Sequence, residues 1–167
     1  MNAHLSLVVS NTKNAFALKR AEKHGIESIF VNPADYSEKR LLDKAIANKL
    51  KEMSIDLICL AGYMRLLGKE FIHTFSGKII NIHPSLLPAF PGLNAQKQAI
   101  EYGVKFSGCT VHFVDNEYDH GSVLLQRQVP VASNDSPETL AARVFLEECE
   151  ALPEAINLLA KRQLTKQ

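Results

Sequence analysis

Short apolar runs alternate along this chain with longer segments whose apolar positions recur every three or four residues. The short runs predict β-strands and the longer segments predict helices. The runs expected to be strands cover residues 4–9, 28–31, 56–61, 78–82, 110–114 and 123–131. Because strands and helices alternate, we expect an α/β fold with a Rossmann-like, open and mostly parallel sheet that has helices on both faces.

Turn and capping residues mark the ends of the expected helices. The helices are expected near residues 12–24, 37–53, 69–75, 94–102 and 136–164, and the last is expected to be interrupted at Pro153 because proline lacks a backbone N–H. The apolar face of the second helix should consist of Leu41, Leu42, Ala45, Ile46, Leu50 and Met53. The run 56–61 is continuously apolar after its first residue and predicts a strand buried on both faces.

Composition narrows the class of protein. The chain has 167 residues, 46% of them apolar, and its 19 basic and 18 acidic residues leave a formal charge of +1. We therefore expect one globular domain over residues 1–167, without a nucleic-acid or membrane partner. No apolar stretch has the length of a membrane span, and no export signal is evident, so a cytoplasmic location is expected.

The strongest chemical signal lies at the end of the strand over residues 78–82. The two-residue period of a strand places Asn81 and His83 on the same side. An amide can stabilise a developing oxyanion, and an imidazole can do so as a cation or can transfer a proton. Taken alone, the pair could equally be a turn asparagine and an ordinary loop histidine. In the same way, the loop 115–121, which holds Asp119, could be only an exposed acidic turn.

Three segments together resemble a known family. They are Asn81-Ile82-His83-Pro84-Ser85-Leu86-Leu87-Pro88, Ala61-Gly62-Tyr63-Met64-Arg65-Leu66-Leu67 and Gly108-Cys109-Thr110-Val111-His112-Phe113-Val114. In this order they are similar to the signature segments of the phosphoribosylglycinamide formyltransferases, folate-dependent enzymes of purine synthesis. The resemblance extends over residues 1–164 and implies the formyltransferase fold.

The resemblance implies roles for individual residues. Asn81, His83 and Asp119 match the catalytic asparagine, histidine and aspartate of that family. The implied reaction is transfer of a formyl group from the co-substrate 10-formyltetrahydrofolate to the amine of glycinamide ribonucleotide. Asn81 and protonated His83 would stabilise the oxygen of the tetrahedral intermediate, and Asp119 would favour the protonated ring and order a water molecule. No metal is implied.

Binding residues are implied in the same way. Those matching the folate site are Met64, Arg65, Leu66, Leu67, Asp115, Asn116, Glu117, Tyr118 and Lys39. Those matching the ribonucleotide site are Asn81, Phe145, Leu146, Glu147 and Glu148, with Glu148 accepting hydrogen bonds from ribose hydroxyls. The histidines His112 and His120 match no common zinc spacing. His120 either adds a titrating group beside Asp119 or faces water, and the resemblance leaves open whether the chain forms a homodimer.

The resemblance also implies a strand, a glycine-rich turn and a helix ahead of residue 4. In that family the turn binds the substrate phosphate through backbone N–H groups, and the strand lies between those that residues 4–9 and 56–61 represent. We expect this N-terminal βα unit to be missing from the chain. Two other functions therefore stay open: a formyltetrahydrofolate deformylase, which Pro84 disfavours, and a folate-binding pseudoenzyme without the phosphate-binding turn.

Overall fold

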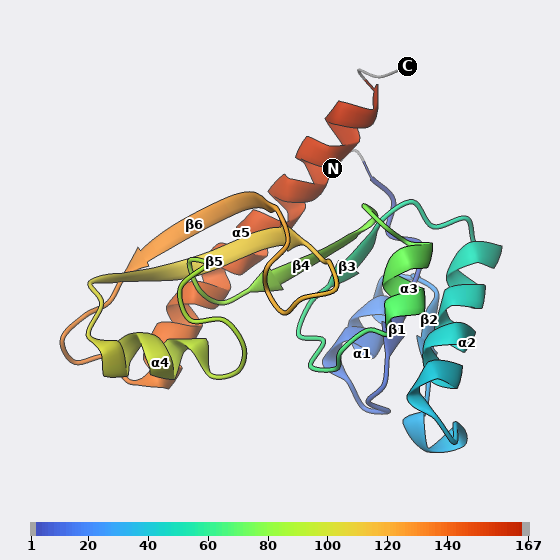
Figure 1. Ribbon diagram of the computed structural model, residues 1–167, viewed down its shortest axis with the longest axis horizontal. Coiled ribbons are helices and arrows are strands. Elements are labelled where there is room, and N and C mark those ends of the chain that lie inside the picture. Colours follow the sequence, from blue (N-terminus) through green and yellow to red (C-terminus); the bar gives the residue numbers. More distant parts are fainter. Residues whose placement is uncertain (1–2, 165–167) are drawn as a thin grey trace. The chain divides into compact units, whose positions relative to one another are not determined.

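The computed structural model describes residues 3–164, and side chains of residues 3–161. It confirms the predicted α/β class, with helices flanking a sheet (Figure 1). The elements in chain order are β1 (Val8–Ser10), α1 (Phe16–Lys23), β2 (Ser28–Phe30), the 3₁₀ turn η1 (Pro33–Asp35), α2 (Lys39–Glu52), β3 (Ile58–Leu60), α3 (Lys69–Thr74), β4 (Ile79–His83), α4 (Ala95–Tyr102), β5 (Phe106–Phe113), β6 (Val123–Pro130) and α5 (Pro137–Leu164). Among these described helices, none combines the length and apolar character needed to cross a membrane.

The chain forms two compact units. The N-terminal unit contains His4–Asp56 and Arg65–Phe75, and the C-terminal unit contains Leu57–Met64 and the chain from Ser76 onward. The N-terminal unit has a parallel strand pair, β1 with β2, together with the helices α1, α2 and α3. A single domain over residues 1–167 stays a prediction, and the ends of that range, residues 1–2 and 165–167, lie outside the described residues.

The C-terminal unit contains a four-stranded sheet in the order β3-β4-β5-β6. The β3–β4 pair is parallel, as predicted, whereas β4–β5 and β5–β6 are antiparallel. Strands β5 and β6 are joined directly by the loop 114–122, which is possible only for antiparallel neighbours because parallel strands need a longer crossover. The register places Asn81 opposite His112 and His83 opposite Thr110, so two pairs of polar residues meet across β4 and β5.

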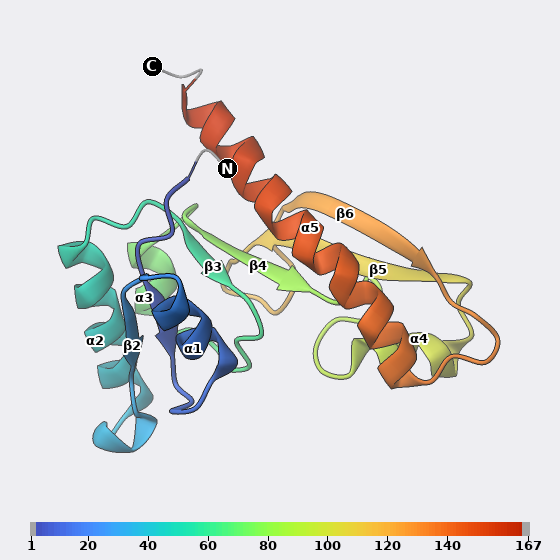
Figure 2. The same cartoon turned by 180° about the vertical axis from the view of Figure 1, so that it is seen from behind.

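The core of the C-terminal unit lies between the sheet and α5, which runs along one face of the sheet (Figure 2). Leu140, Val144, Ala151 and Ala155 of α5 are fully buried in this core. The expected interruption at Pro153 is wrong, because α5 is continuous through the proline. Buried residues of α5 on both sides of Pro153 pack against the sheet, and this tertiary packing holds the helix although the proline lacks a backbone N–H.

Two expectations about burial are also wrong. Within the run 56–61 only Ile58–Leu60 form a strand, and Cys59 is exposed rather than buried. Among the described residues β3 pairs only with β4, so it is an edge strand and has fewer neighbours to cover it. On α2, Leu41 is exposed and Asp43 is buried, because the face that packs is centred on Leu42, Ala47 and Leu50.

A close approach of two backbones requires glycine in β5. A Cβ added to Gly108 would lie 1.9 Å from the carbonyl oxygen of Arg127 on β6. Gly108→Ala must therefore push the two strands apart, and we expect the free energy of unfolding to fall by about 3 kcal/mol, measured by urea denaturation.

The neighbouring residue provides a matched control. Ser107 is buried, and its hydroxyl has no hydrogen-bond partner among the described residues. Ser107→Ala removes a polar group that gains nothing from burial, so stability should be unchanged or increased. If the Gly108 and Ser107 variants unfold at the same urea concentration, the close approach does not limit stability.

Candidate active site

Strand β4 carries the two central polar residues of the site. Its first two residues, Ile79 and Ile80, are buried apolar side chains that fix the strand between β3 and β5. Asn81 and His83 follow at the carboxyl end of the strand, where the two-residue period places both on one side. The predicted juxtaposition of an amide and an imidazole is therefore present.

His83 is held by contacts at both ring nitrogens. Its Nε2 lies 2.9 Å from the carbonyl oxygen of Phe90, and its Nδ1 lies 3.3 Å from Oδ2 of Asp119. The side chains of His83 and Asp119 are only 6% and 12% exposed. The carbonyl oxygen of Phe90 can only accept a hydrogen bond, so Nε2 of His83 carries a proton. Nδ1 faces the Asp119 carboxylate, so the two side chains form an ion pair when Nδ1 is protonated as well.

Asp119 is fixed by the backbone around it. It lies in the loop between β5 and β6 with a φ of 47°, a left-handed conformation that aspartate tolerates better than most residues. Its Oδ2 also accepts a hydrogen bond from the N–H of Gly92, with a donor to acceptor distance of 2.9 Å. Oδ2 of Asp119 thus contacts both His83 and the loop 84–92 that follows His83.

His112 of β5 completes the set of polar groups. Its Nδ1 donates to the carbonyl oxygen of Phe113 at 2.8 Å, so its Nε2 can accept from the amide Nδ2 of Asn81 at 3.2 Å. Burial of the ring lowers the pKa of His112, which agrees with this neutral form. His112 therefore orients the Asn81 amide. Its Nε2 also lies 3.7 Å from Oδ1 of Asp119.

Side chains of β5 and β6 anchor the loop 84–92 through hydrogen bonds to its backbone. Thr110 of β5 donates its hydroxyl to the carbonyl oxygen of Ser85 at 2.7 Å and accepts from the N–H of Leu87 at 3.0 Å. Gln126 of β6 donates to the carbonyl oxygen of Leu87 at 2.8 Å. These buried contacts hold the loop, and with it the Phe90 carbonyl group that binds His83.

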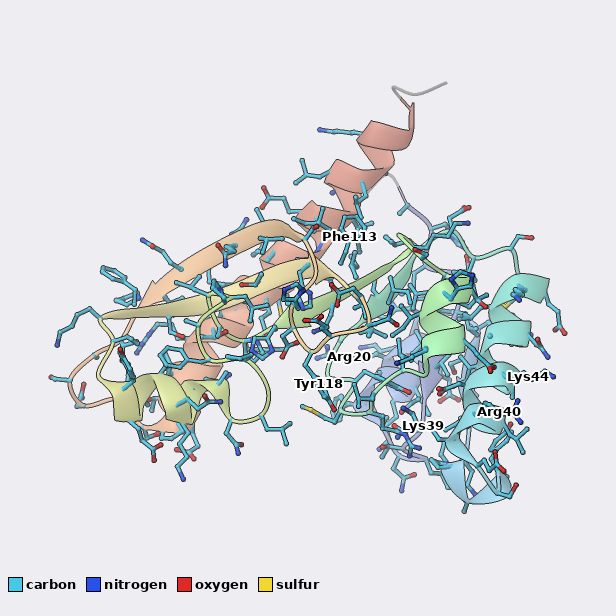
Figure 3. All side chains as sticks on the ribbon, in the orientation of Figure 1. Arg20, Lys39, Arg40, Lys44, Phe113 and Tyr118 are labelled. Atoms are coloured by element: carbon cyan, nitrogen blue, oxygen red, sulfur yellow. The ribbon has the colours of Figure 1, made fainter. Side chains whose placement is uncertain are left out.

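The remaining loop residues expected at the folate site lie on the surface. Asp115 accepts from the N–H of Glu117 at 2.9 Å, and the side chains of Asn116, Glu117 and Tyr118 are exposed. Tyr118 is labelled in Figure 3. His120 lies beside Asp115, with Nδ1 3.4 Å from its Oδ2, and is 68% exposed. Of the two expectations for His120, contact with solvent describes it better than a position beside Asp119.

The other expected folate residues are divided between the units. Met64 is exposed in the C-terminal unit, whereas Arg65, Leu66 and Leu67 belong to the N-terminal unit. Lys39 is the first residue of α2, is exposed and also belongs to the N-terminal unit (Figure 3). The structure describes each unit by itself, so whether these residues share a site with Asp119 stays a prediction.

Apart from Asn81 on β4, the expected ribonucleotide residues lie on α5. Phe145 and Leu146 are exposed, and Glu147 is paired with Arg127 of β6 at 3.1 Å. Glu148 is half-buried and has no hydrogen bond or ion pair among the described residues, and burial raises the pKa of its carboxyl group. Glu148 is thus the better placed of the two carboxylates to accept from a ligand.

Sequence reasoning missed the contribution of His112 and of the backbone groups at Phe90 and Gly92. A signal for His112 was present, since Thr110 and His112 alternate with apolar residues in a buried strand and so share one side of it. Among the described residues, no group of three or more His, Cys, Asp or Glu side chains is arranged to hold a metal ion.

Comparison with known proteins identifies the family to which the chain is similar. A family described as formyl transferase matches residues 1–156. The phosphoribosylglycinamide formyltransferase of Bacillus subtilis is 40% identical over 158 residues, which are 95% of this chain and 81% of that protein. The trifunctional purine biosynthetic protein adenosine-3 of Bos taurus is 45% identical over 158 residues, which are 95% of this chain but 16% of that protein.

Solved structures give the same result. The glycinamide ribonucleotide transformylase 1 of Symbiobacterium toebii superposes with a TM-score of 0.91 at 47% identity, over 93% of this chain and 74% of that one. The phosphoribosylglycinamide formyltransferase of Brucella melitensis superposes with a TM-score of 0.89 at 44% identity, over 93% and 80%. The sequence match and the shared fold show that this chain belongs to the formyl transferase family.

Proposed function

We propose that the chain transfers a formyl group from 10-formyltetrahydrofolate to the amine of glycinamide ribonucleotide, a step of purine synthesis. The observation that carries this proposal is the contact of His83 Nδ1 with Asp119 Oδ2 at 3.3 Å, with Asn81 on the same side of β4. An amide, an imidazolium and a carboxylate suit transfer between two amines, because the oxyanion needs donors and the departing nitrogen needs a proton. The names of the relatives support the same substrates.

In the proposed reaction, the amine nitrogen of the ribonucleotide attacks the formyl carbon and forms a new C–N bond. The carbonyl electrons move to oxygen, where the second N–H of the Asn81 amide donates a hydrogen bond and the positive charge of the His83 imidazolium stabilises the oxyanion. The attacking nitrogen then loses a proton and N10 of the folate gains one, by way of water ordered at Asp119. The bond from carbon to N10 breaks, which leaves formylglycinamide ribonucleotide and tetrahydrofolate. Because the substrate supplies the nucleophile, no covalent enzyme intermediate is needed.

The proposal assigns binding roles as well. Glu148 accepts from the ribose hydroxyls, since it has no competing partner among the described residues. Met64, Arg65, Leu66 and Leu67, with residues 115–118, receive the pterin, and Lys39 neutralises the carboxylates of the folate tail. The proposal includes a cytoplasmic location and small-molecule substrates without a metal, nucleic acid or membrane partner.

A product assay distinguishes this function from the two alternatives. Purified protein is incubated with 10-formyltetrahydrofolate, with and without glycinamide ribonucleotide, and the formylated ribonucleotide and formate are measured separately. Formylated ribonucleotide as the main product supports the transferase. Formate released at the same rate without ribonucleotide identifies a deformylase, and folate binding without either product identifies a binding protein.

A further inference from the structure

The helix α2 buries a carboxylate among apolar side chains. Asp43 is 5% exposed and lies next to Leu42 on the packed face of the helix, together with Ala47 and Leu50. Removing a carboxylate from water is costly unless it gains strong hydrogen bonds. The reason for its position should therefore be found in what the side chain contacts.

Asp43 contacts the backbone at the start of α3. Its Oδ2 accepts a hydrogen bond from the N–H of Gly68 at 2.8 Å, while its buried Oδ1 has no partner among the described residues. The carbonyl oxygen of Gly68 accepts from the N–H of Ile72 at 3.1 Å, so this residue is fixed on both sides of its Cα atom. Asp43 thus holds the junction between α3 and the segment before it.

The carboxylate of Asp43 fills the space that a side chain at Gly68 would occupy. A Cβ added at Gly68 would lie 2.8 Å from Oδ2 of Asp43, inside van der Waals contact. Gly68 and Asp43 therefore form one local arrangement, in which the missing side chain of one residue permits the hydrogen bond of the other.

The segment that ends at this junction consists of Arg65, Leu66 and Leu67, all in the N-terminal unit. We propose that Asp43 is a positioning residue for folate binding, because its hydrogen bond to Gly68 fixes the backbone of these three residues. This inference rests on the proposed function, in which that backbone reads the edge of the pterin.

The same helix carries the residue proposed to bind the other end of the folate. Lys39 and Asp43 are four residues apart and lie on neighbouring positions of one side of α2. Lys39 is exposed at the start of the helix, whereas Asp43 is buried one turn later. A rigid helix thus sets the distance between the cation for the folate tail and the anchor of the pterin segment.

The test compares two substitutions at Asp43. Asp43→Asn keeps an oxygen that can accept from Gly68, whereas Asp43→Ala removes it. We expect Asp43→Ala to raise the Kd for tetrahydrofolate, measured by direct titration, and the KM for 10-formyltetrahydrofolate about tenfold. The KM for the ribonucleotide and kcat should stay within about twofold. Asp43→Asn should stay within about twofold of the parent protein in every constant.

Amide hydrogen exchange gives a second readout that does not depend on activity. The N–H of Gly68 should exchange at least tenfold faster in Asp43→Ala than in Asp43→Asn, because only the alanine variant lacks the acceptor. Leu50→Ala is the matched control: it removes a buried side chain of the same helix and lowers stability without touching Gly68. Its Kd for tetrahydrofolate should not change.

The outcomes separate this inference from the proposed function. An unchanged Kd and unchanged Gly68 exchange in Asp43→Ala would overturn it, as would an equal rise of Kd in Leu50→Ala, which would reduce the effect to stability alone. If the parent protein binds tetrahydrofolate but transfers no formyl group, the proposed function fails. The Kd values of the two Asp43 variants would still decide the role of this residue.

Discussion

Replacing His83 by alanine is expected to lower kcat about a thousandfold, while the KM values for both substrates stay within about threefold. The ring has no apolar role that alanine could preserve, because both of its nitrogens face acceptors, Phe90 and Asp119. In the proposed reaction the imidazolium stabilises charge that exists only after the amine has attacked. Its loss therefore affects the transition state more than the bound ground state. Steady-state formyl transfer, measured with each substrate varied in turn, checks both constants.

The control must separate chemistry from folding. His73→Ala changes an exposed histidine of α3 and should leave kcat unchanged. Tetrahydrofolate titration of the His83 variant should give a Kd close to that of the parent protein, which shows that the site is still formed. A His83→Ala variant that retains more than a tenth of the parent kcat would remove this residue from the proposed mechanism.

The class of fold was predictable because it depends on periodicity, which is local in the sequence. All six expected strands and all five expected helices are present. Their ends were less predictable, since they depend on partners. The first strand begins at Val8, not at residue 4, because Val8 is the first residue that pairs with β2. Likewise, β5 begins at Phe106, four residues before the predicted start, because β6 extends alongside it as far as Pro130.

The candidate site also has some features that the sequence could predict and others that it could not. Asn81 and His83 could be placed on one side of a strand from spacing alone. The position of Asp119 beside them was implied only by family resemblance, because it depends on the left-handed turn of a loop 36 residues further along the chain. The contact between Asn81 and His112 depends on the antiparallel register of β4 and β5, whereas the apolar pattern had predicted a mostly parallel sheet.

Asp119→Asn is expected to lower kcat about a hundredfold and to change the Kd for tetrahydrofolate by less than threefold. The asparagine keeps an oxygen that can accept from the N–H of Gly92, so the loop should remain in place. What is lost is the negative charge 3.3 Å from Nδ1 of His83, which in the proposed mechanism balances the positive charge of the ring. A hundredfold change in kcat corresponds to about 2.7 kcal/mol of transition-state stabilisation, a reasonable value for a charge in a largely buried site.

Two further substitutions separate charge from position at Asp119. Asp119→Ala removes both the charge and the acceptor for Gly92, so it should lower kcat at least as much as the asparagine and also raise the Kd for tetrahydrofolate. Asp56→Asn removes an exposed carboxylate elsewhere and should change neither constant. If the alanine and asparagine variants differ in Kd but both keep the parent kcat, Asp119 only anchors the loop. A lower kcat in the asparagine variant is by itself enough to require a catalytic role for the charge, because that variant retains the hydrogen bond to Gly92.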